Sequence, residues 1–90
     1  MRVDQFLKRS CLVKHRSFAK LACDRGRVFV DGVKAKPSKE LRVGSRVVLS
    51  LTDGDLEIEV VAIPKGNVSK ARAQELYRVL RDETKSLQGF

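Results

Sequence analysis

The chain has 90 residues with 19 Lys and Arg, 11 Asp and Glu, and a formal net charge of +8. A chain of this length forms one small domain near the lower limit for a single hydrophobic core, so we expect no second, catalytic domain. It contains no apolar run long enough for a signal peptide or a membrane span, and we therefore expect a cytoplasmic protein that does not enter a membrane. Its two cysteines are expected to be reduced thiols rather than parts of a disulfide framework.

The positive charge is concentrated in the first half of the chain. Residues 1–46 hold 13 Lys and Arg against 4 Asp and Glu, whereas residues 47–90 hold 6 against 7. The two halves therefore carry net charges of +9 and −1, which together give the total of +8. Segregation of this kind gives one surface a positive potential that attracts nucleic acid or an anionic membrane.

The first predicted element is a short helix within residues 3–10. Its apolar residues recur at helical spacing and are expected in the core: Val3, Phe6 and Leu7. Arg2 and Arg9 fall on the other side of the helix and are expected to face solvent.

A second helix is predicted over about residues 17–25, with Ser17 as its N-cap and Gly26 just past its C-terminal end. Its apolar stripe, which we expect to be buried, consists of Phe18, Leu21 and Ala22. Arg16 and Lys20 fall on the opposite side, so burial of the stripe turns both cations outward.

Four short strands are predicted next, over residues 28–30, 33–36, 47–51 and 56–63. Asp31–Gly32 is a strong two-residue signal for a hairpin between the first two strands. Residues 52–55 form a second hairpin turn, and Pro64 and Gly66 end the sheet.

The last predicted element is a helix of four to five turns that begins at Ser69. Its apolar stripe contains Ala73, Leu76, Tyr77, Leu80 and Leu87. We expect this stripe to dock back on the sheet, because a core this small needs the apolar area; a groove for a partner protein is the alternative. Two helices, short hairpins and a closing helix predict an α+β domain with the N-terminal helices packed on a small antiparallel sheet.

Two stretches, "MRVDQFLK" and "HRSFAKLACDRGRVFVDG", resemble the signature of the S-four domain, an RNA-binding domain first described in the fourth protein of the small ribosomal subunit. That signature reads Arg-Leu-Asp-x-x-Leu, then a basic loop, Ser-x-x-Ala-x-x-Leu, and Gly-x-Val-x-Val-Asn-Gly. Roughly residues 1–50 carry the resemblance. His15 stands where Arg is common, Asp31 replaces the usual Asn, and Phe29 is bulkier than the family habit.

The length, the Met-Arg start, the "KHRSFAK" loop and the Tyr-containing C-terminal segment are similar to the RqcP-like family of stand-alone S-four proteins of bacterial ribosome-associated quality control. That family is related to the ribosome-associated S-four heat-shock protein. The resemblance implies an S-four-type RNA-binding domain in residues 1–63, followed in residues 64–90 by a linker and a C-terminal helix that packs on it.

For function, the same resemblance implies binding to large-subunit rRNA and peptidyl-tRNA on the large ribosomal subunit. It implies support for C-terminal alanine tailing of stalled nascent chains by an RqcH-type tailing factor. We expect a monomer. A heat-shock-type factor that recycles free large subunits with stranded nascent chains is the alternative within the family. A partner-protein module and a basic DNA-associated protein are the alternatives outside it.

The RNA-binding residues are expected on one basic face, formed by Arg2, Arg9, Lys14, His15, Arg16, Ser17, Lys20, Lys34 and Lys36. Arg2 and Arg16 coincide with the family pattern and are expected to be the principal phosphate clamps. Asp4 is expected to orient Arg2 or to cap the first helix, because an acid that faced phosphate would repel it. Unpaired backbone N–H groups near Ser17 offer a further phosphate site.

The sequence offers little for catalysis or metal binding, so we expect neither an enzyme nor a cofactor. His15 is the sole histidine, and no Gly-rich phosphate loop or nucleophile motif is present. Cys11, His15 and Cys23 would supply only three ligands of a structural zinc site that needs four. Both thiols are expected to be small buried or half-buried groups; a more reactive thiolate at Cys23, which lies near the cationic side of its helix, is the alternative. Phe29 either stacks on a base or is buried under the last helix.

Overall fold

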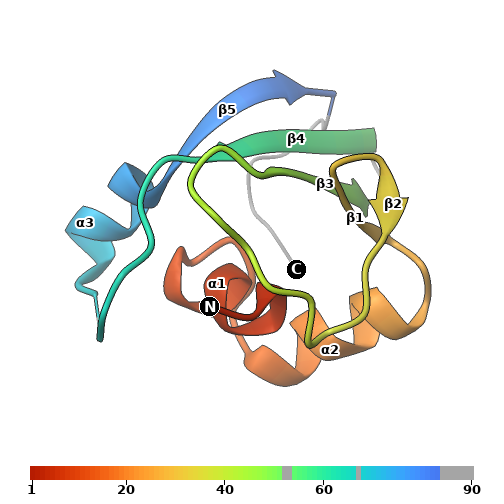
Figure 1. Cartoon of the computed structure of the whole chain (residues 1–90), viewed down its shortest axis with the longest axis horizontal. Helices are drawn as coiled ribbons and strands as arrows, with labels where there is room; N and C mark the ends of the chain where they lie inside the picture. The colour runs from red at the N-terminus through yellow and green to blue at the C-terminus, as the bar shows by residue number, and fades with distance from the viewer. Residues whose placement is uncertain (52–53, 67, 84–90) are drawn as a thin grey trace.

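The spacing of apolar residues produces two helices that lie on one face of an antiparallel sheet (Figure 1). The computed structural model describes residues 1–51, 54–66 and 68–83. Its five strands are ordered β2-β1-β3-β4-β5, and each neighbouring pair is antiparallel. The elements are α1 (Val3–Arg9), α2 (Arg16–Asp24), β1 (Val28–Val30), β2 (Val33–Lys34), β3 (Arg46–Leu51), β4 (Gly54–Val60), α3 (Lys70–Ala73), the 3-10 turn η1 (Gln74–Leu76) and β5 (Tyr77–Asp82). The predicted α+β class is confirmed.

The core lies between α1, α2 and the inner face of the sheet. Val3, Phe6 and Leu7 of α1 are fully buried, as their helical spacing predicts. They share one apolar cluster with the inward-facing strand residues Val28, Val30, Val47, Leu49, Ile58 and Val60. Alternation along the strands therefore points every second side chain at the helices.

The helix α2 begins one residue earlier than predicted, and its N-cap is His15 rather than Ser17. The backbone of His15 is extended, and its carbonyl accepts the N–H groups of Phe18 and Ala19 at 3.0 and 3.3 Å. Ser17 consequently lies inside the first turn, so its predicted role as the N-cap is wrong. The other end is as predicted: Gly26, at φ +70°, ends the helix in a left-handed turn.

The buried side of α2 differs from the predicted one. Ala19, Ala22 and Cys23 face the core, whereas Phe18 and Leu21 are 43% and 46% exposed. Small side chains on this side let α2 approach its neighbours closely, and that approach decides which flank is covered. The expectation that Phe18 and Leu21 are core residues is therefore wrong.

The first predicted hairpin is present at Asp31–Gly32. Val30 of β1 pairs with Val33 of β2, and the two turn residues have φ angles of +51° and +86°. Positive φ at both positions is the requirement of a type I′ turn, which matches the twist of the flanking strands. β2 is shorter than predicted and ends at Lys34.

The second predicted hairpin joins β3 and β4, which pair from Arg46↔Glu59 to Leu51↔Gly54. Thr52 and Asp53 of its predicted turn lie outside the described residues. β4 ends at Val60, before the predicted end of the strand at residue 63. The sheet does not end near Pro64, because a further strand joins it.

The long helix predicted from Ser69 is wrong for most of its described length. Only Lys70–Ala73 is α-helical, followed by the single turn η1 and then by β5, which pairs with β4 from Leu56↔Asp82 to Val60↔Tyr77. The periodicity of Ala73, Leu76 and Tyr77 suits a helix equally well, but the edge of β4 offers backbone pairing to residues 77–82, interrupted by one register shift between Glu57 and Ile58.

The apolar residues of this segment divide between core and solvent. Ala73 and Leu76 are buried, whereas Leu80 is exposed, and the predicted stripe member Leu87 lies outside the described residues. The division of the chain after residue 63 stays a prediction. Of the helices in the described ranges, none is long and apolar enough to cross a membrane.

Candidate nucleic-acid interface

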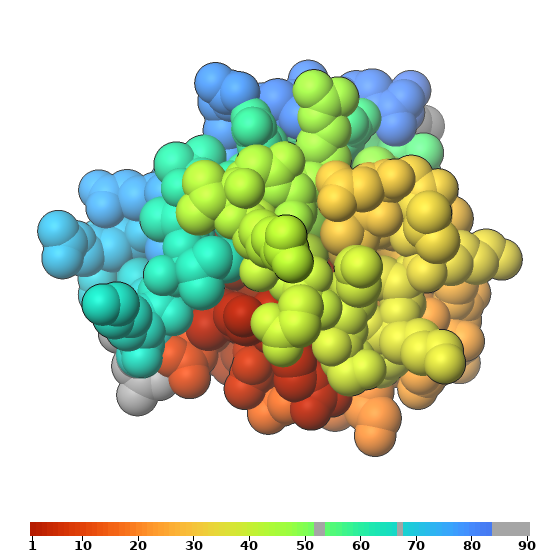
Figure 2. Space-filling view, viewed as in Figure 1, coloured from red at the N-terminus to blue at the C-terminus, as the bar shows by residue number. Residues whose placement is uncertain are grey.

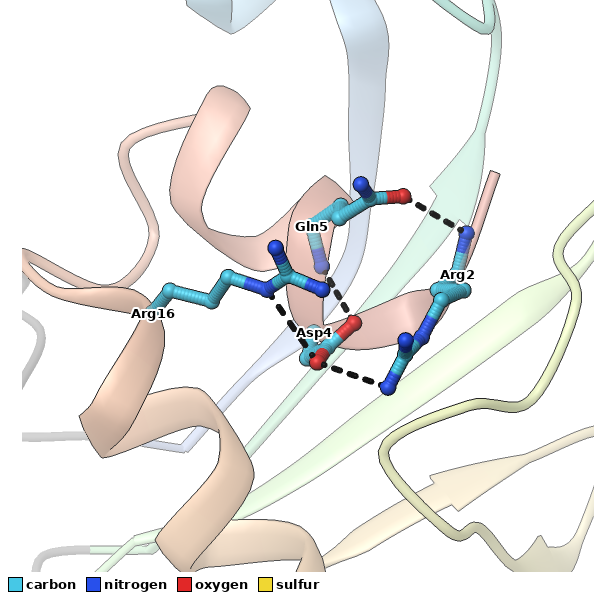
Figure 3. Close-up of polar contacts among 4 residues, drawn as sticks. All are labelled: Arg2, Asp4, Gln5 and Arg16. Carbon is cyan, nitrogen blue, oxygen red and sulfur yellow. Dashed lines mark hydrogen bonds and ion pairs between the residues drawn. The ribbon is translucent and has the colours of Figure 1, made fainter.

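Asp4, in the first turn of α1, holds two arginines together (Figure 3). Its side chain is 2% exposed, and its Oδ2 accepts hydrogen bonds from Arg2 Nη2 at 3.4 Å and from Arg16 Nε at 3.3 Å. Its Oδ1 accepts the backbone N–H of Gln5 at 2.8 Å. A buried carboxylate is stable only when charged or hydrogen-bonding partners surround it. The predicted orientation of Arg2 by Asp4 is thus confirmed, and Arg16 is held by the same group.

Both guanidinium groups remain partly exposed to a second anion, although Arg2 Nε is buried without a partner among the described residues. The Arg2 and Arg16 side chains are 41% and 50% exposed, and each gives Asp4 one hydrogen bond. A guanidinium carries five N–H donors in a planar fork that suits phosphate, so the exposed donors form charge-assisted bonds readily. Two cations and one anion leave the cluster with a net charge of +1. This Asp4-centred arginine pair is the geometric centre of the candidate interface.

The start of α2 adds exposed polar and basic groups next to Arg16. Lys14, His15, Ser17 and Lys20 are all exposed. The side chain of the N-cap residue His15 makes no capping hydrogen bond to the first N–H groups of α2 within the described part of the chain. Lys20 follows Arg16 by about one helical turn. The structure therefore gathers these predicted site residues around the arginine pair.

A loop between β2 and β3 borders the same region. The carbonyl of Pro37 accepts the N–H of Asp4 at 3.3 Å, and the carbonyl of Lys39 accepts the N–H of Val3 at 2.8 Å. In Figure 2 this yellow-green loop lies directly against the red N-terminal residues. Lys36 and Lys39, both exposed, are thereby brought beside the start of α1. Lys39 is absent from the predicted site, because no local pattern reveals a backbone contact with a residue so distant in sequence.

Two predicted site residues lie away from the arginine pair. The Nζ of Lys34 lies 3.4 Å from the point a Cβ on Gly26 would occupy, next to the C-terminal end of α2. Arg9 is the last residue of α1, and its Nη1 is buried with no hydrogen-bond partner within the described part of the chain. Arg9 therefore turns partly inward instead of projecting fully into solvent. RNA contacts by Arg9 and Lys34 stay predictions.

Cys23 and Cys11 differ in burial, and Cys23 is the buried thiol of the two. Burial, followed by the negative charges of Asp4 and Asp24, raises the pKa of the Cys23 thiol to about 11. The thiol is protonated at neutral pH, so the idea of a reactive thiolate is wrong. Cys11 is exposed, and no three His, Cys, Asp or Glu side chains of the described residues are placed to share a metal ion.

The segment that builds this interface matches a known protein family. The family described as the S4 domain matches residues 1–47, which include α1, α2, β1, β2 and the loop that borders Arg2. The chain belongs to the S4 domain family. The S-four resemblance seen in the sequence is thus confirmed.

Relatives of similar length extend the S4 similarity to most of the chain. This chain is 34% identical over 83 residues to a Listeria innocua protein named RQC P-site tRNA stabilizing factor, and the alignment covers 92% of this chain and 89% of that protein. It is 36% identical over 83 residues to a Halalkalibacterium halodurans protein of the same name, covering 92% and 93%. Its fold matches the trimeric structure of Vibrio cholerae heat shock protein 15 with a TM-score of 0.83 and 29% identity, covering 92% and 84%. This chain is therefore similar to proteins of both kinds named in the sequence analysis, the quality-control factor and the heat-shock protein.

Proposed function

We propose that this protein is an RNA-binding factor of ribosome-associated quality control that binds the large ribosomal subunit and stabilises the P-site tRNA. It would contact ribosomal RNA and peptidyl-tRNA as a cytoplasmic monomer. Through these contacts it would support C-terminal alanine tailing of stalled nascent chains by an RqcH-type factor. It acts by positioning RNA, without a catalytic group or a cofactor of its own.

The observation that carries this proposal is the Asp4-centred arginine pair. The pair lies within the S4-matched segment of a chain similar over 92% of its length to a protein named RQC P-site tRNA stabilizing factor. Arg2 and Arg16 come from two different helices, and one buried carboxylate fixes their separation. Two pre-oriented cations bind a phosphate backbone with less loss of side-chain entropy than two free arginines would. They therefore suit a protein that must hold RNA in one register.

The surrounding groups extend the phosphate contact on both sides. Lys14, His15, Ser17 and Lys20 border the pair along α2, and Lys36 borders it on the adjacent loop. The first N–H groups of α2 add a positive helix end that favours phosphate. Phosphate contacts fix position and orientation but read no sequence. A factor of this kind recognises RNA by its shape and by where the ribosome presents it.

Subunit recycling of the heat-shock type is the second candidate within the family. The fold similarity to heat shock protein 15 favours it, and both functions use the same basic surface. We prefer tRNA stabilisation because the identity to the proteins of that name is higher, at 34% and 36% against 29%. Alanine tailing separates the two roles, since both act on large subunits that carry a stalled nascent chain and only the first supports the tailing of that chain.

The test is co-sedimentation of tagged protein with ribosomal subunits in a bacterial lysate at low and moderate salt. We expect wild type on large subunits together with peptidyl-tRNA, and the Arg2→Ala/Arg16→Ala variant in the unbound fraction. The matched control is Arg78→Ala/Arg81→Ala, which removes the same charge from β5, where both arginines already pair with acids. We expect this control to sediment like wild type.

Two further measurements make the outcome decisive. Thermal unfolding of each variant establishes that loss of binding is not loss of folding. Alanine tails on a stalled reporter chain are expected to decrease with Arg2→Ala/Arg16→Ala and to persist with the β5 control. If both double variants leave the large subunit equally, net charge alone drives binding and the proposed clamp is wrong. If neither leaves, the arginine pair is not the ribosomal site.

A further inference from the structure

Gln5 is a neutral polar side chain within the candidate interface. It is the third residue of α1, and the buried carboxylate of Asp4 accepts its backbone N–H at 2.8 Å. Helical spacing places it between two cations, because Arg2 lies three residues before it and Arg9 four residues after it on the same face of α1. A phosphate backbone that follows this face from Arg2 toward Arg9 therefore passes over Gln5.

The amide of Gln5 is held in one orientation. The backbone N–H of Arg2 can only donate, so it faces the amide oxygen Oε1 at 3.4 Å and turns the Nε2 donors the other way (Figure 3). Among the described residues Nε2 has no hydrogen-bond partner, and it is not enclosed by them. Gln5 thus presents a fixed, neutral donor beside Arg2.

The cations of the interface do not by themselves distinguish RNA from DNA. Arginine and lysine bind phosphate, which both nucleic acids share, and these contacts fix position and orientation. The difference between the two is the 2′-hydroxyl, which accepts and donates hydrogen bonds and projects from the sugar between consecutive phosphates. A neutral donor between two cations along the strand suits that hydroxyl, whereas a further cation there would favour another phosphate.

We infer that Gln5 Nε2 donates a hydrogen bond to a 2′-hydroxyl of the RNA whose phosphates Arg2 and Arg16 hold, so that the interface prefers ribose to deoxyribose. This inference rests on the proposed function and adds to it the residue that distinguishes RNA from DNA. Gln5 keeps its structural role when RNA binds, because Oε1 stays on the N–H of Arg2 while Nε2 contacts the sugar.

The test uses a synthetic RNA hairpin and a set of copies in which one ribose at a time is replaced by deoxyribose. Every copy keeps all phosphates and bases, so a change in affinity reports the 2′-hydroxyl. We expect wild type to lose about three- to tenfold in affinity at one position, which is the effect of one neutral hydrogen bond. Gln5→Met, which keeps the length of the side chain without its amide, should bind the all-ribose hairpin more weakly by the same factor and show no further loss at that position.

Gln5→Glu separates the sugar contact from the structural role. Its carboxylate still accepts the N–H of Arg2 but has no donor, so α1 should be preserved and the ribose preference should disappear. The added negative charge lowers affinity for every hairpin of the set and therefore leaves the comparison of ribose with deoxyribose intact. Thermal unfolding establishes that both Gln5 variants stay folded.

The matched controls are Gln74→Met and Ser17→Ala. Gln74 is an exposed amide in η1, outside the interface, and Ser17 is an exposed neutral group next to Arg16. We expect Gln74→Met to bind every hairpin like wild type. Ser17→Ala should keep the wild-type loss at the sensitive position, because its hydroxyl is not the group that contacts the sugar.

Three outcomes would overturn the inference. They are equal binding of all copies by wild type, a ribose preference that persists in Gln5→Met and Gln5→Glu, and loss of the preference in Ser17→Ala. Co-sedimentation with large subunits keeps such a failure apart from failure of the proposed function. If Arg2→Ala/Arg16→Ala leaves the subunits and wild type stays on them without a ribose preference, only the sugar contact is refuted. If the double variant binds subunits and hairpin like wild type, the proposed interface is wrong.

Discussion

At the scale of single residues, one buried carboxylate decides how the basic surface is arranged. Asp4 is the partner of both Arg2 and Arg16 and also accepts the N–H of Gln5. Long cationic side chains on a surface are normally mobile and lose rotamer entropy when they bind. Because Asp4 already holds both arginines in the folded protein, part of this rotamer entropy is lost during folding and not on binding. We therefore expect Asp4 to strengthen RNA binding, although its own charge opposes the ligand.

Substitution of Asp4 tests this directly, because charge and positioning predict opposite results. Asp4→Asn raises the net charge by one, so Coulomb attraction alone would tighten RNA binding. We expect the affinity to fall about tenfold instead, because ordering a side chain costs about 0.5–1.5 kcal/mol and two arginines lose their anchor. The measurement is RNA affinity at fixed salt, together with the free energy of unfolding.

The control for this substitution is Glu40→Gln. Glu40 is exposed and pairs with the N-terminal amine at 2.9 Å, so its loss makes the same charge change close by without touching either guanidinium. We expect affinity to stay the same or rise slightly. If Asp4→Asn and Glu40→Gln both tighten binding, net charge governs the interface and Asp4 does not position the arginines.

At the scale of secondary-structure elements, β5 forms because β4 presents a complementary edge. Arg78 of β5 pairs with Glu59, and Arg81 pairs with Glu57 at 3.7 Å. Opposite charges across neighbouring strands contribute modestly, whereas backbone pairing satisfies donors and acceptors on both sides of the register shift between Glu57 and Ile58. The short helix α3 only turns the chain back toward β4. Residues 77–82 therefore complete the sheet that the first four strands begin.

The closing of this sheet makes Gly54 more sensitive than a glycine in an open turn. A Cβ on Gly54 would lie 2.5 Å from the carbonyl oxygen of Glu83, which must shift to make room. Gly54→Ala would also strain a φ of +139° and disturb the hydrogen bond between Glu83 N–H and the Asp55 carbonyl. Such a bond contributes about 1 kcal/mol. We expect a loss in unfolding free energy of more than about 2 kcal/mol, measured by urea denaturation.

The matched variant is Gly32→Ala in the first hairpin. Gly32 has a φ of +86° but nothing within 4 Å of the added Cβ. Only backbone strain then lowers the unfolding free energy, by about 1–2 kcal/mol. Equal losses for the two variants would contradict the close approach of Glu83 to Gly54. Hydrogen exchange at the end of β5 should increase with Gly54→Ala and not with Gly32→Ala.

At the scale of the whole molecule, the two halves of the chain divide their charges differently. The acids of β4 pair across the strand ladder with the arginines of β5, so this side of the molecule carries little excess charge. The excess of positive charge belongs to residues 1–46. A nucleic acid is therefore attracted to the surface formed by α1, α2 and the loop between β2 and β3.

This distribution predicts the salt dependence of RNA binding. If four to six phosphates are neutralised, the logarithm of affinity should fall with the logarithm of salt at a slope of about −3 to −5. Arg2→Ala/Arg16→Ala should reduce the steepness of this slope by about 1.5, because two phosphate contacts are lost. Arg78→Ala/Arg81→Ala should leave it unchanged. A titration in which both double variants flatten the slope equally would contradict a localised interface.

Features that depend on a few neighbouring residues were predictable from the sequence. The stripe of Val3, Phe6 and Leu7, the type I′ turn at Asp31–Gly32 and the end of α2 at Gly26 all follow from local spacing and backbone preference. The S-four motif likewise identified the family. These features were predictable because their determinants lie within one or two turns of chain.

The tertiary structure alone decided the features that depend on contacts between distant segments. Residues 77–82 suit a helix or a strand by themselves, and the open edge of β4 selects the strand. The close approach of α2 to its neighbours buries Ala19 and leaves Phe18 exposed. Asp4 meets Arg16, and Lys39 meets the start of α1, only because the fold brings separate elements together. Local sequence sets the elements, whereas burial and backbone pairing across the fold determine which surfaces remain free to bind RNA.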